Sequence, residues 1–257
     1  MLAAMSARTI AVGDIHGQLV ELKALLAKLP VLSSADTLLF IGDYLDRGPQ
    51  SAEVVRFVRE ELPHATPARI VTLRGNHEDA WLKTADGGGP EFVLPVGNGC
   101  LATLRSFSGG PPPKPGEFPE KREEMEALFK ASFFPSEVVA WMRGLQYFHE
   151  DEHALYIHGG LPTREGAWSH PRDYADPTVL VWCRDEDFFS SYRGKRVVFG
   201  HTPVRYLPQE LSRHTPTDRS DIYLAGDVVG IDTGCGRGGF LSAVALPSLK
   251  VYESRGA

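Results

Sequence analysis

The sequence predicts an α/β fold with two packed sheets, and three patterns indicate it. Residues 8–42 read as strand, helix and strand, a βαβ unit that places its loops at one sheet edge. After residue 154, short β-branched runs joined by Gly-containing turns favour a second, mixed sheet packed on the first. Islands of Asp, His, Asn and Gly follow five of the apolar runs, so their polar side chains would gather at strand ends.

The first half of the chain alternates strands with helices. Strands are expected at three short apolar runs: Thr9–Val12, Thr37–Ile41 and Arg69–Leu73. Leucines at helical spacing predict a helix over Gln18–Leu29, and Pro30 stops it. A second helix is expected to begin near Pro49 and to end at Pro63, because proline suits a first helical turn and interrupts a helix interior.

The middle of the chain is irregular over residues 86–119, where Gly and Pro cluster twice. Short helices are expected at three places: Leu101–Phe107, Lys121–Ala131 and Ser136–Leu145. One interpretation makes this stretch a surface insertion without a role. The other makes it a cap beside the site that shapes substrate access. We expect a single domain over residues 1–257, with residues 86–145 as a cap or insertion within it, because the polar islands on either side must converge.

The second half is expected to be rich in strands. Seven runs carry the pattern: Ala154–Ile157, Val179–Trp182, Arg196–Phe199, Ile222–Leu224, Val228–Ile231, Phe240–Leu246 and Lys250–Tyr252. The polar stretch Gln209–Asp221 predicts a mobile loop.

Bulk properties exclude several classes of protein. With 257 residues, 42% of them hydrophobic, the chain can bury a sizeable core. A net charge of −6 argues against a nucleic-acid partner. Three cysteines without paired spacing favour free thiols in a reducing compartment. Neither a leader with a basic start and apolar core nor a window long enough to span a membrane is found, so we expect a cytoplasmic protein without a membrane partner.

The polar islands supply the ligands of a two-metal site. Six side chains are candidate ligands: Asp14, His16, Asp43, Asn76, His158 and His201. Asp14, His16 and Asp43 would hold the first ion. Asn76, His158 and His201 would complete the second, with the Asp43 carboxylate bridging both. Carboxylates mixed with neutral imidazoles suit Mn²⁺, Fe²⁺ or Zn²⁺ better than Ca²⁺, and Mn²⁺ is our first expectation.

Such a site predicts hydrolytic chemistry. Six ligands shared by two ions leave positions for water and substrate, which is typical of a catalytic rather than a structural site. Two ions roughly 3.5–4 Å apart can hold a bridging water, lower its pKa from near 16 toward about 7 and bind phosphoryl oxygens. In-line attack by that bridging hydroxide then needs no covalent enzyme intermediate.

Four further residues complete the expected reaction site. His77 adjoins a metal ligand but is surplus to the ligand count, so it is the candidate general acid, and Asp46 would hold its tautomer. Arg47 carries a planar guanidinium matched to two phosphate oxygens, and Arg184 offers a second. Trp81, Trp141 and Trp168 are expected to be packing residues.

Taken together, the order GD-x-HG, GD-xx-DRG, GNHE, HGG and GHT resembles the phosphoprotein phosphatase family of calcineurin-like metallophosphoesterases, in particular its bacterial-type serine/threonine phosphatases. The resemblance spans residues 8 to about 250. It implies a four-layer α-β-β-α sandwich, a dinuclear centre, phosphomonoester hydrolysis and the ten residue roles given above.

Two residues bear on the substrate class. The related symmetrical dinucleoside tetraphosphatases usually lack the second Asp of the second motif and end the third motif in Asp, whereas this chain has Asp46 and Glu78. The main prediction is therefore a serine/threonine protein phosphatase acting on phosphorylated proteins. Alternatives are a symmetrical dinucleoside tetraphosphatase or another small-phosphoester hydrolase, a phosphotyrosine phosphatase, or an inactive metal-binding module.

Overall fold

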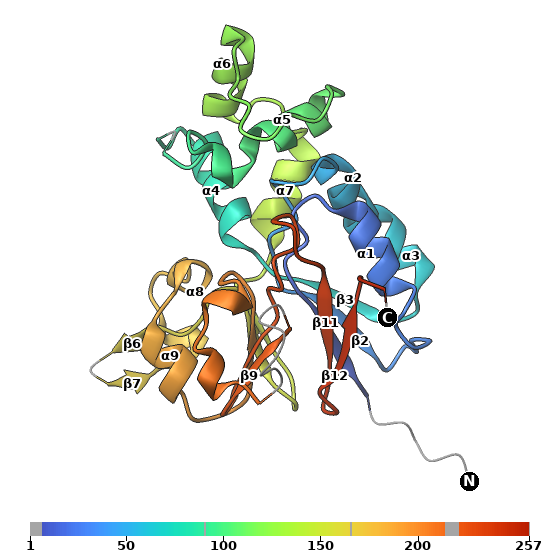
Figure 1. Cartoon of the computed structure of the whole chain (residues 1–257), viewed down its shortest axis with the longest axis vertical. Coiled ribbons are helices and arrows are strands. Elements are labelled where there is room, and N and C mark those ends of the chain that lie inside the picture. Colours follow the sequence, from blue (N-terminus) through green and yellow to red (C-terminus); the bar gives the residue numbers. More distant parts are fainter. Residues whose placement is uncertain (1–6, 90, 165, 214–220, 257) are drawn as a thin grey trace.

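Two five-stranded sheets form the centre of the protein (Figure 1). The computed structural model describes residues 7–89, 91–164, 166–213 and 221–256. Among these residues, no helix is both long and apolar enough to cross a bilayer.

The first sheet has the strand order β12-β11-β1-β2-β3. Its members are β1 (Thr9–Val12), β2 (Thr37–Phe40), β3 (Arg69–Thr72), β11 (Ser242–Leu246) and β12 (Lys250–Glu253). Strands β1, β2 and β3 run parallel, whereas β11 is antiparallel to both β1 and β12. The carboxyl ends of the three parallel strands therefore lie at one sheet edge.

The second sheet has the order β4-β5-β8-β10-β9. Its members are β4 (Phe148–Glu150), β5 (Leu155–Ile157), β8 (Val197–Phe199), β9 (Tyr223–Ala225) and β10 (Val228–Gly230). Here β5, β8 and β10 are parallel, and β4 and β9 are antiparallel edge strands. A short hairpin of β6 (Thr163–Arg164) and β7 (Ala167–Trp168) stands apart from both sheets.

Helices cover the outer faces of both sheets. The first sheet carries α1 (Leu19–Leu26), α2 (Ser51–Arg56), α3 (Leu62–Ala65), α4 (Asn76–Ala85), α5 (Cys100–Ser108), α6 (Arg122–Lys130) and α7 (Ser136–Gly144) on its side of the molecule. The second sheet carries α8 (Val179–Trp182) and α9 (Glu186–Ser191). Helices α5 and α6 lie beyond the end of the first sheet, at the top of Figure 1.

Alternation along each strand divides the apolar side chains among three cores. In β1, Ile10 and Val12 face the helices, while Ala11 faces the second sheet. In β8, Val198 packs into the same inter-sheet core as Ala11. Because successive side chains of a strand point to opposite faces, two stacked sheets with helices outside give four layers. The predicted α-β-β-α sandwich is confirmed.

The predicted strand Val179–Trp182 is wrong, because these residues form helix α8. The side chain of Asp176 accepts hydrogen bonds from the backbone N–H and hydroxyl of Thr178, at 3.0 and 2.7 Å. Leu180 N then donates to Pro177 O at 3.0 Å, which closes a helical turn. An Asp-Pro-Thr start signal therefore outweighs the β propensity of the apolar run.

Two further expectations need correction or restriction. The second predicted helix does not end at Pro63: a π-turn over Phe57–Glu61 joins α2 to α3, which continues to Ala65. The wider turn carries the chain into Pro63, which has no backbone N–H to donate. Of the predicted mobile loop Gln209–Asp221, the described part begins with a 3₁₀ turn at Gln209–Leu211. Residues 214–220 lie outside the described residues.

A partly buried ion pair joins the start of β1 to the loop before β2. The carboxylate of Asp36 accepts from Arg8 Nε at 2.9 Å and Arg8 Nη2 at 2.8 Å. It also accepts from Ser33 N at 2.8 Å and Ser33 Oγ at 3.0 Å. The hydrogen bonds from Arg8 hold the pKa of Asp36 well below its usual range, against the opposing effect of burial.

This pair predicts a pH dependence of stability. The pKa of Asp36 is lower in the folded chain, so its stabilisation is present above the unfolded pKa of about 4 and lost as pH falls toward the folded value. Asp36→Asn should lower the free energy of unfolding at pH 7 by about 1.5–3 kcal/mol in urea titrations, with a smaller difference at pH 3. The control Glu126→Gln, in an exposed pair with Arg122, should cost under about 1 kcal/mol. A cost for Asp36→Asn that does not change with pH would contradict this assignment.

Candidate metal centre and active site

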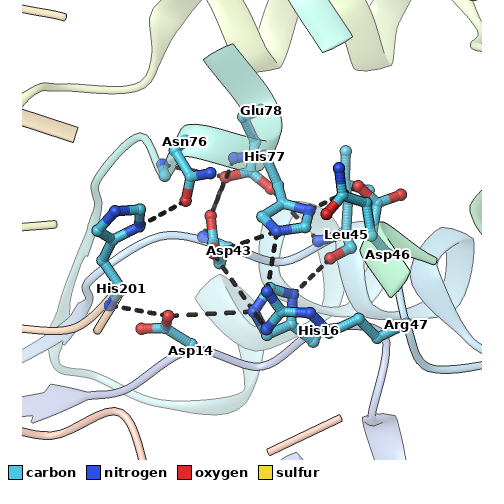
Figure 2. Close-up of polar contacts among 12 residues, drawn as sticks. Asp14, His16, Asp43, Leu45, Asp46, Arg47, Asn76, His77, Glu78 and His201 are labelled. Atoms are coloured by element: carbon cyan, nitrogen blue, oxygen red, sulfur yellow. Dashed lines mark hydrogen bonds and ion pairs between the residues drawn. The ribbon is translucent and has the colours of Figure 1, made fainter. Parts of the chain in front are cut away.

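The structure brings the six predicted ligands together at the edges of the two sheets. Figure 2 labels five of them: Asp14, His16, Asp43, Asn76 and His201. Each follows a strand or the turn after it: Asp14 and His16 follow β1, Asp43 follows β2, Asn76 follows β3, His158 follows β5 and His201 follows β8. All six are buried. Parallel strand ends thus collect side chains from positions 187 residues apart in the sequence.

The Asp43 carboxylate lies between two groups of ligands. Its Oδ2 is 3.3 Å from His16 Nε2, and its Oδ1 is 3.3 Å from His158 Nε2. His16 Nε2 is also 4.0 Å from Asp14 Oδ2. Each oxygen of Asp43 therefore faces a different histidine, which is the arrangement that a bridging carboxylate requires.

Asn76 joins the two remaining histidines. Its Oδ1 lies 3.1 Å from His158 Nε2 and 2.8 Å from His201 Nδ1. The backbone N–H of His201 donates to Asp14 Oδ2 at 2.9 Å, and this hydrogen bond connects the second group of ligands to the first.

Hydrogen bonds to carbonyl groups fix the tautomers of two histidines. His16 Nδ1 lies 2.9 Å from Leu45 O, and His158 Nδ1 lies 3.1 Å from Ile41 O. A carbonyl only accepts, so each Nδ1 carries a proton, and Nε2 is the nitrogen left to bind a metal ion. Second partners of this kind orient metal-binding histidines.

These residues fit a pair of divalent ions. Asp14 Oδ1 and His201 Nε2 are buried polar atoms without a hydrogen-bond partner among the described residues, although such atoms are normally paired. The guanidinium of Arg47 lies between the Nε2 atoms of His16 and His77. The positive charge of Arg47 thus already faces the Nε2 atom of His16, the atom that would bind a metal ion.

Electrostatics favour the metal-binding form of two histidines. Burial, followed by the charge of Arg47, lowers the pKa of His16. Burial, followed by the charges of His158 and Arg184, lowers the pKa of His201. Both imidazoles are therefore neutral near pH 7, which is the form that binds a metal ion.

His158 behaves differently because it faces Asp43. Although burial opposes protonation, the Asp43 carboxylate raises the pKa of His158 to about 9 in the metal-free chain. A metal ligand must give up such a proton, so metal binding is coupled to proton release at this histidine.

Five site residues have left-handed backbone conformations, with φ between +48° and +71°: His16, Asp43, Asp46, Arg47 and His201. Such conformations are costly for residues with a side chain, by about 1–3 kcal/mol each, and they cluster at functional sites. They turn the chain sharply as it leaves each strand, which directs the side chains inward.

Two motif glycines are required by the close approach of ligand carboxylates. A Cβ at Gly75 would lie 2.1 Å from Asp43 Oδ1, and a Cβ at Gly200 would lie 2.1 Å from Asp14 Oδ1. Both distances are far inside van der Waals contact. The glycine before Asn76 and the glycine before His201 are thus needed for space.

Glu78 fixes two ligand turns at once. Its Oε2 accepts from the backbone N–H groups of Asp43 and Gly75, each at 3.0 Å. Its Oε1 accepts from those of Tyr44 at 2.9 Å and Leu45 at 3.3 Å. Four N–H donors thus converge on one buried carboxylate. Burial and the Asp43 carboxylate raise the pKa of Glu78, and the backbone donors oppose this effect. Because N–H donors face both of its oxygens, the ionised carboxylate is the form that matches these contacts.

The predicted acid pair is in contact. His77 Nδ1 lies 2.6 Å from Asp46 Oδ2, and the other ring nitrogen faces the site, 3.9 Å from Asp43 Oδ2. Asp46 also accepts from Trp81 Nε1 at 3.0 Å and from Thr103 Oγ1 at 2.6 Å. Helices α4 and α5 therefore both hold the carboxylate that orients His77.

His77 also meets the geometric criteria for a metal ligand. His16, Asp43 and His77 offer ligand atoms within 4.8 Å of one another, as do Asp14, Asp43 and His158. A carboxylate behind an imidazole is found in general acids and in metal-binding histidines alike. The number of metal ions bound after removal of His77 separates the two roles.

The two predicted phosphate-binding arginines lie at the site. Arg47 contacts both His16 and His77. Arg184 is exposed and close enough to His201 to lower its pKa. One guanidinium therefore contacts a candidate ligand, His16, and the other is close to His201.

Asp232 is a site residue that sequence reasoning left out. It is buried and follows β10, and its charge raises the pKa of Asp14, second only to the effect of burial. Its Oδ1 accepts from Gly234 N at 2.9 Å, whereas its Oδ2 has no partner among the described residues. The signal that finds it is the same strand-end rule that finds the other ligands, applied to the apolar run Val228–Ile231.

The bridging geometry predicts the effect of changing Asp43. Asp43→Asn should weaken the binding of both Mn²⁺ ions. Replacing a residue that only hydrogen-bonds a metal ligand lowers metal affinity about 10–100-fold, and the loss here should be larger. Titration of metal-free protein followed by calorimetry measures this. His77→Ala should still bind two ions. Two tight ions in Asp43→Asn, or a lost ion in His77→Ala, would contradict the assigned roles.

The four amide contacts predict that Glu78 positions Asp43. Glu78→Gln turns one acceptor into a donor facing N–H groups, so it should lower the free energy of unfolding by about 3 kcal/mol, since hydrogen bonds to charged groups contribute about 1.5–3 kcal/mol each. Mn²⁺ affinity should fall about 10–100-fold. The control Glu53→Gln changes a helix carboxylate that accepts from Ser106 and should keep wild-type affinity. Wild-type Mn²⁺ binding in Glu78→Gln would exclude the positioning role.

Comparison with known proteins identifies relatives over nearly the whole chain. A symmetrical bis(5′-nucleosyl)-tetraphosphatase of Chromobacterium violaceum is 26% identical over 95% of this chain and 93% of its own. An asymmetrical bis(5′-nucleosyl)-tetraphosphatase of Bacillus subtilis is 27% identical over 94% and 92%. The symmetrical enzyme of Pectobacterium carotovorum is 46% identical over 70 residues, and the match spans 23% of that relative's length.

The fold is shared with a solved structure described as a candidate diadenosine tetraphosphatase. That chain has a TM-score of 0.59 and 22% identity, and the match covers 98% of this chain and 95% of that one. Residues 7–231 match the calcineurin-like phosphoesterase family, so the predicted metallophosphoesterase class is confirmed. Its members generally bind two divalent metal ions. This protein belongs to the calcineurin-like phosphoesterase family.

Proposed function

We propose that this protein hydrolyses dinucleoside polyphosphates, with bis(5′-nucleosyl)-tetraphosphates as its first candidate substrates. The observation that carries the proposal is the alignment, over more than nine-tenths of both chains, with relatives named as symmetrical and asymmetrical tetraphosphatases. It replaces the serine/threonine phosphatase as our leading candidate and adopts an alternative that the sequence left open. Both kinds of relative align, so the proposal names the substrate class and leaves the cleaved bond to product analysis.

The residues of the site suit this chemistry. Arg47 and Arg184 can bind a phosphate chain from two sides, since guanidinium groups match pairs of phosphate oxygens. Two divalent ions, when bound, polarise a phosphoryl group and lower the pKa of a water. Six ligands would hold them: Asp14, His16, Asp43, Asn76, His158 and His201. His77, oriented by Asp46, can donate a proton to the leaving oxygen.

A phosphoserine or phosphothreonine phosphatase is the second candidate, and the acid pair favours it. A serine alkoxide is a strongly basic leaving group that needs protonation, whereas a released nucleoside phosphate has a second pKa of about 6 and needs little. The 2.6 Å contact between His77 and Asp46 therefore favours a phosphoprotein substrate, whereas the named relatives favour a dinucleoside polyphosphate. Phosphotyrosine peptides belong in the same test.

A substrate panel decides between the candidates. Mn²⁺-reconstituted protein should hydrolyse diadenosine tetraphosphate with a kcat/KM at least about tenfold above that for phosphoserine, phosphothreonine and phosphotyrosine peptides. Chromatography of the nucleotides distinguishes two ADP from AMP plus ATP. The reverse order of kcat/KM would return the assignment to a protein phosphatase.

His77→Ala adds a leaving-group test to the same panel. Its rate on a phosphoserine peptide should fall by about 10²–10⁴-fold, because the basic leaving oxygen loses its acid. The losses on nitrophenyl phosphate and diadenosine tetraphosphate should be much smaller. Asp46→Asn should show the same order more weakly, since it only misorients the imidazole. Equal losses on all substrates would mean that His77 serves the metal ions or the fold.

A further inference from the structure

A large cavity opens beside the metal centre and is not used by the chemistry described so far. Its volume is about 820 Å³, within the range of small-molecule sites. It is lined by residues of α4, of α8 and of the loop after α4, and α8 contacts α4. Phe92 and Trp182 supply its aromatic surface.

The two aromatic rings form a right-angled corner that leads out of the site. Their centroids are 6.1 Å apart and their planes meet at 84°. The Phe92 ring also packs against His77, with centroids 4.9 Å apart, and the Trp182 ring packs against His201 at 6.4 Å. The corner therefore begins at the candidate general acid and at a candidate metal ligand. A group attached to a phosphate bound at the metals would reach it directly.

Trp182 is held in place yet exposed. Its Nε1 donates to Asp79 Oδ2 at 2.9 Å, which fixes the plane of the indole. The side chain remains 43% exposed, whereas Trp81 is buried and Trp141 and Trp168 are half-buried. A fixed indole with a free surface is suited to stacking, because it loses little conformational freedom when a planar group binds.

The charges around the cavity are balanced. Three basic and three acidic residues line it: Arg74, Lys83, Arg143, Asp79, Asp86 and Glu91. Arg143 is paired with Asp86 at 3.1 Å, and Arg74 donates to the hydroxyl of Tyr147 and to two backbone carbonyls. A cavity with this balance offers no strong attraction to a phosphate chain. It suits an uncharged planar group instead.

We propose that this cavity is a nucleoside subsite in which one base of a dinucleoside polyphosphate stacks on Trp182. The phosphates attached to that nucleoside would extend toward Arg184 and the metal ligands. Base–aromatic stacking tolerates any base, because every base has a π face. The subsite rests on the proposed dinucleoside polyphosphate activity, although its base-binding part is testable without hydrolysis.

Binding of AMP to the metal-free 257-residue chain tests the subsite directly. AMP should quench part of the tryptophan fluorescence in a saturable manner, and ribose 5-phosphate, which has the phosphate but no base, should not. Trp182→Phe should lose this quenching. The matched control Trp168→Phe removes a tryptophan in β7, away from the cavity, and should keep it.

Calorimetry measures the stacking contribution. Trp182→Ala should weaken AMP binding about 5- to 150-fold, the range that corresponds to loss of one stacked base. Asp79→Ala keeps the indole but frees it, so it should weaken AMP binding by less than Trp182→Ala. If Trp182→Ala does not fold, the AMP affinity of Asp79→Ala and the quenching of wild-type fluorescence by AMP still test the subsite.

Each remaining result overturns the subsite. Equal binding of AMP and ribose 5-phosphate would show that the base is not bound. Binding of N-acetyltyrosinamide but not AMP would make the cavity a site for a peptide aromatic side chain. Undetectable AMP binding at millimolar concentration, or wild-type affinity in Trp182→Ala, would also exclude it.

The outcomes for the subsite and for the proposed function are distinguishable. Base-dependent AMP binding without hydrolysis of diadenosine tetraphosphate would keep the subsite and reject the proposed activity. Hydrolysis of diadenosine tetraphosphate with an unchanged KM and unchanged AMP affinity in Trp182→Ala would keep the activity and reject the subsite.

Discussion

The carboxylate of Glu78 and the backbone amides around it are the contact on which the metal centre depends. Glu78 is the third residue of α4, and its two oxygens accept from the turn after β2 and from the turn after β3. Asp43 belongs to the first turn, and Asn76 directly follows the second. One side chain thus sets the separation of the candidate bridging carboxylate, Asp43, from a candidate ligand of the second ion, Asn76. Because four donors converge on it, neither turn can move without leaving a buried amide unpaired.

This constraint makes the strained backbone at the site tolerable. Asp43 and four other site residues have positive φ. Residues with a side chain keep this conformation only when the surrounding structure enforces it. The neighbouring turns interlock: the N–H groups of Ile15 and His16 donate to Asp43 O at 3.0 and 2.8 Å, and Gly48 N donates to His16 O at 2.9 Å. Gly75 lies so close to the carboxylate of Asp43 that no side chain fits at this position. Packing and hydrogen bonds between turns therefore fix conformations that local sequence disfavours.

The sequence predicts which polar side chains gather where one rule applies, namely that a polar residue after a buried parallel strand lies at the common sheet edge. That rule locates all six candidate ligands, and it would have located Asp232 had it been applied to the strand over Val228–Gly230. It fails for Val179–Trp182, where four apolar residues carry no information about period and the deciding signal lies in the preceding Asp-Pro-Thr.

Contacts between distant segments could not be predicted in this way. The bonds from Thr103 to Asp46 and from Trp182 to Asp79 join residues 57 and 103 positions apart, and no local pattern marks them. Asp46 lies in the second motif, whereas Thr103, Asp79 and Trp182 lie outside the motifs. Each depends on how a later helix packs against the site, since α5 carries Thr103 and α8 carries Trp182.

These distant contacts separate chemistry from specificity. The metal ligands depend on strand ends and on Glu78, whereas the orientation of His77 depends on Asp46, which α4 and α5 hold through Trp81 and Thr103. Phe92, in the loop between those helices, contacts His77 on one side and Trp182 on the other. The segment after α4 therefore reaches both the acid pair and the proposed nucleoside subsite. A change there can alter the leaving group that the site protonates and the group that it binds, while the metal ligands stay in place.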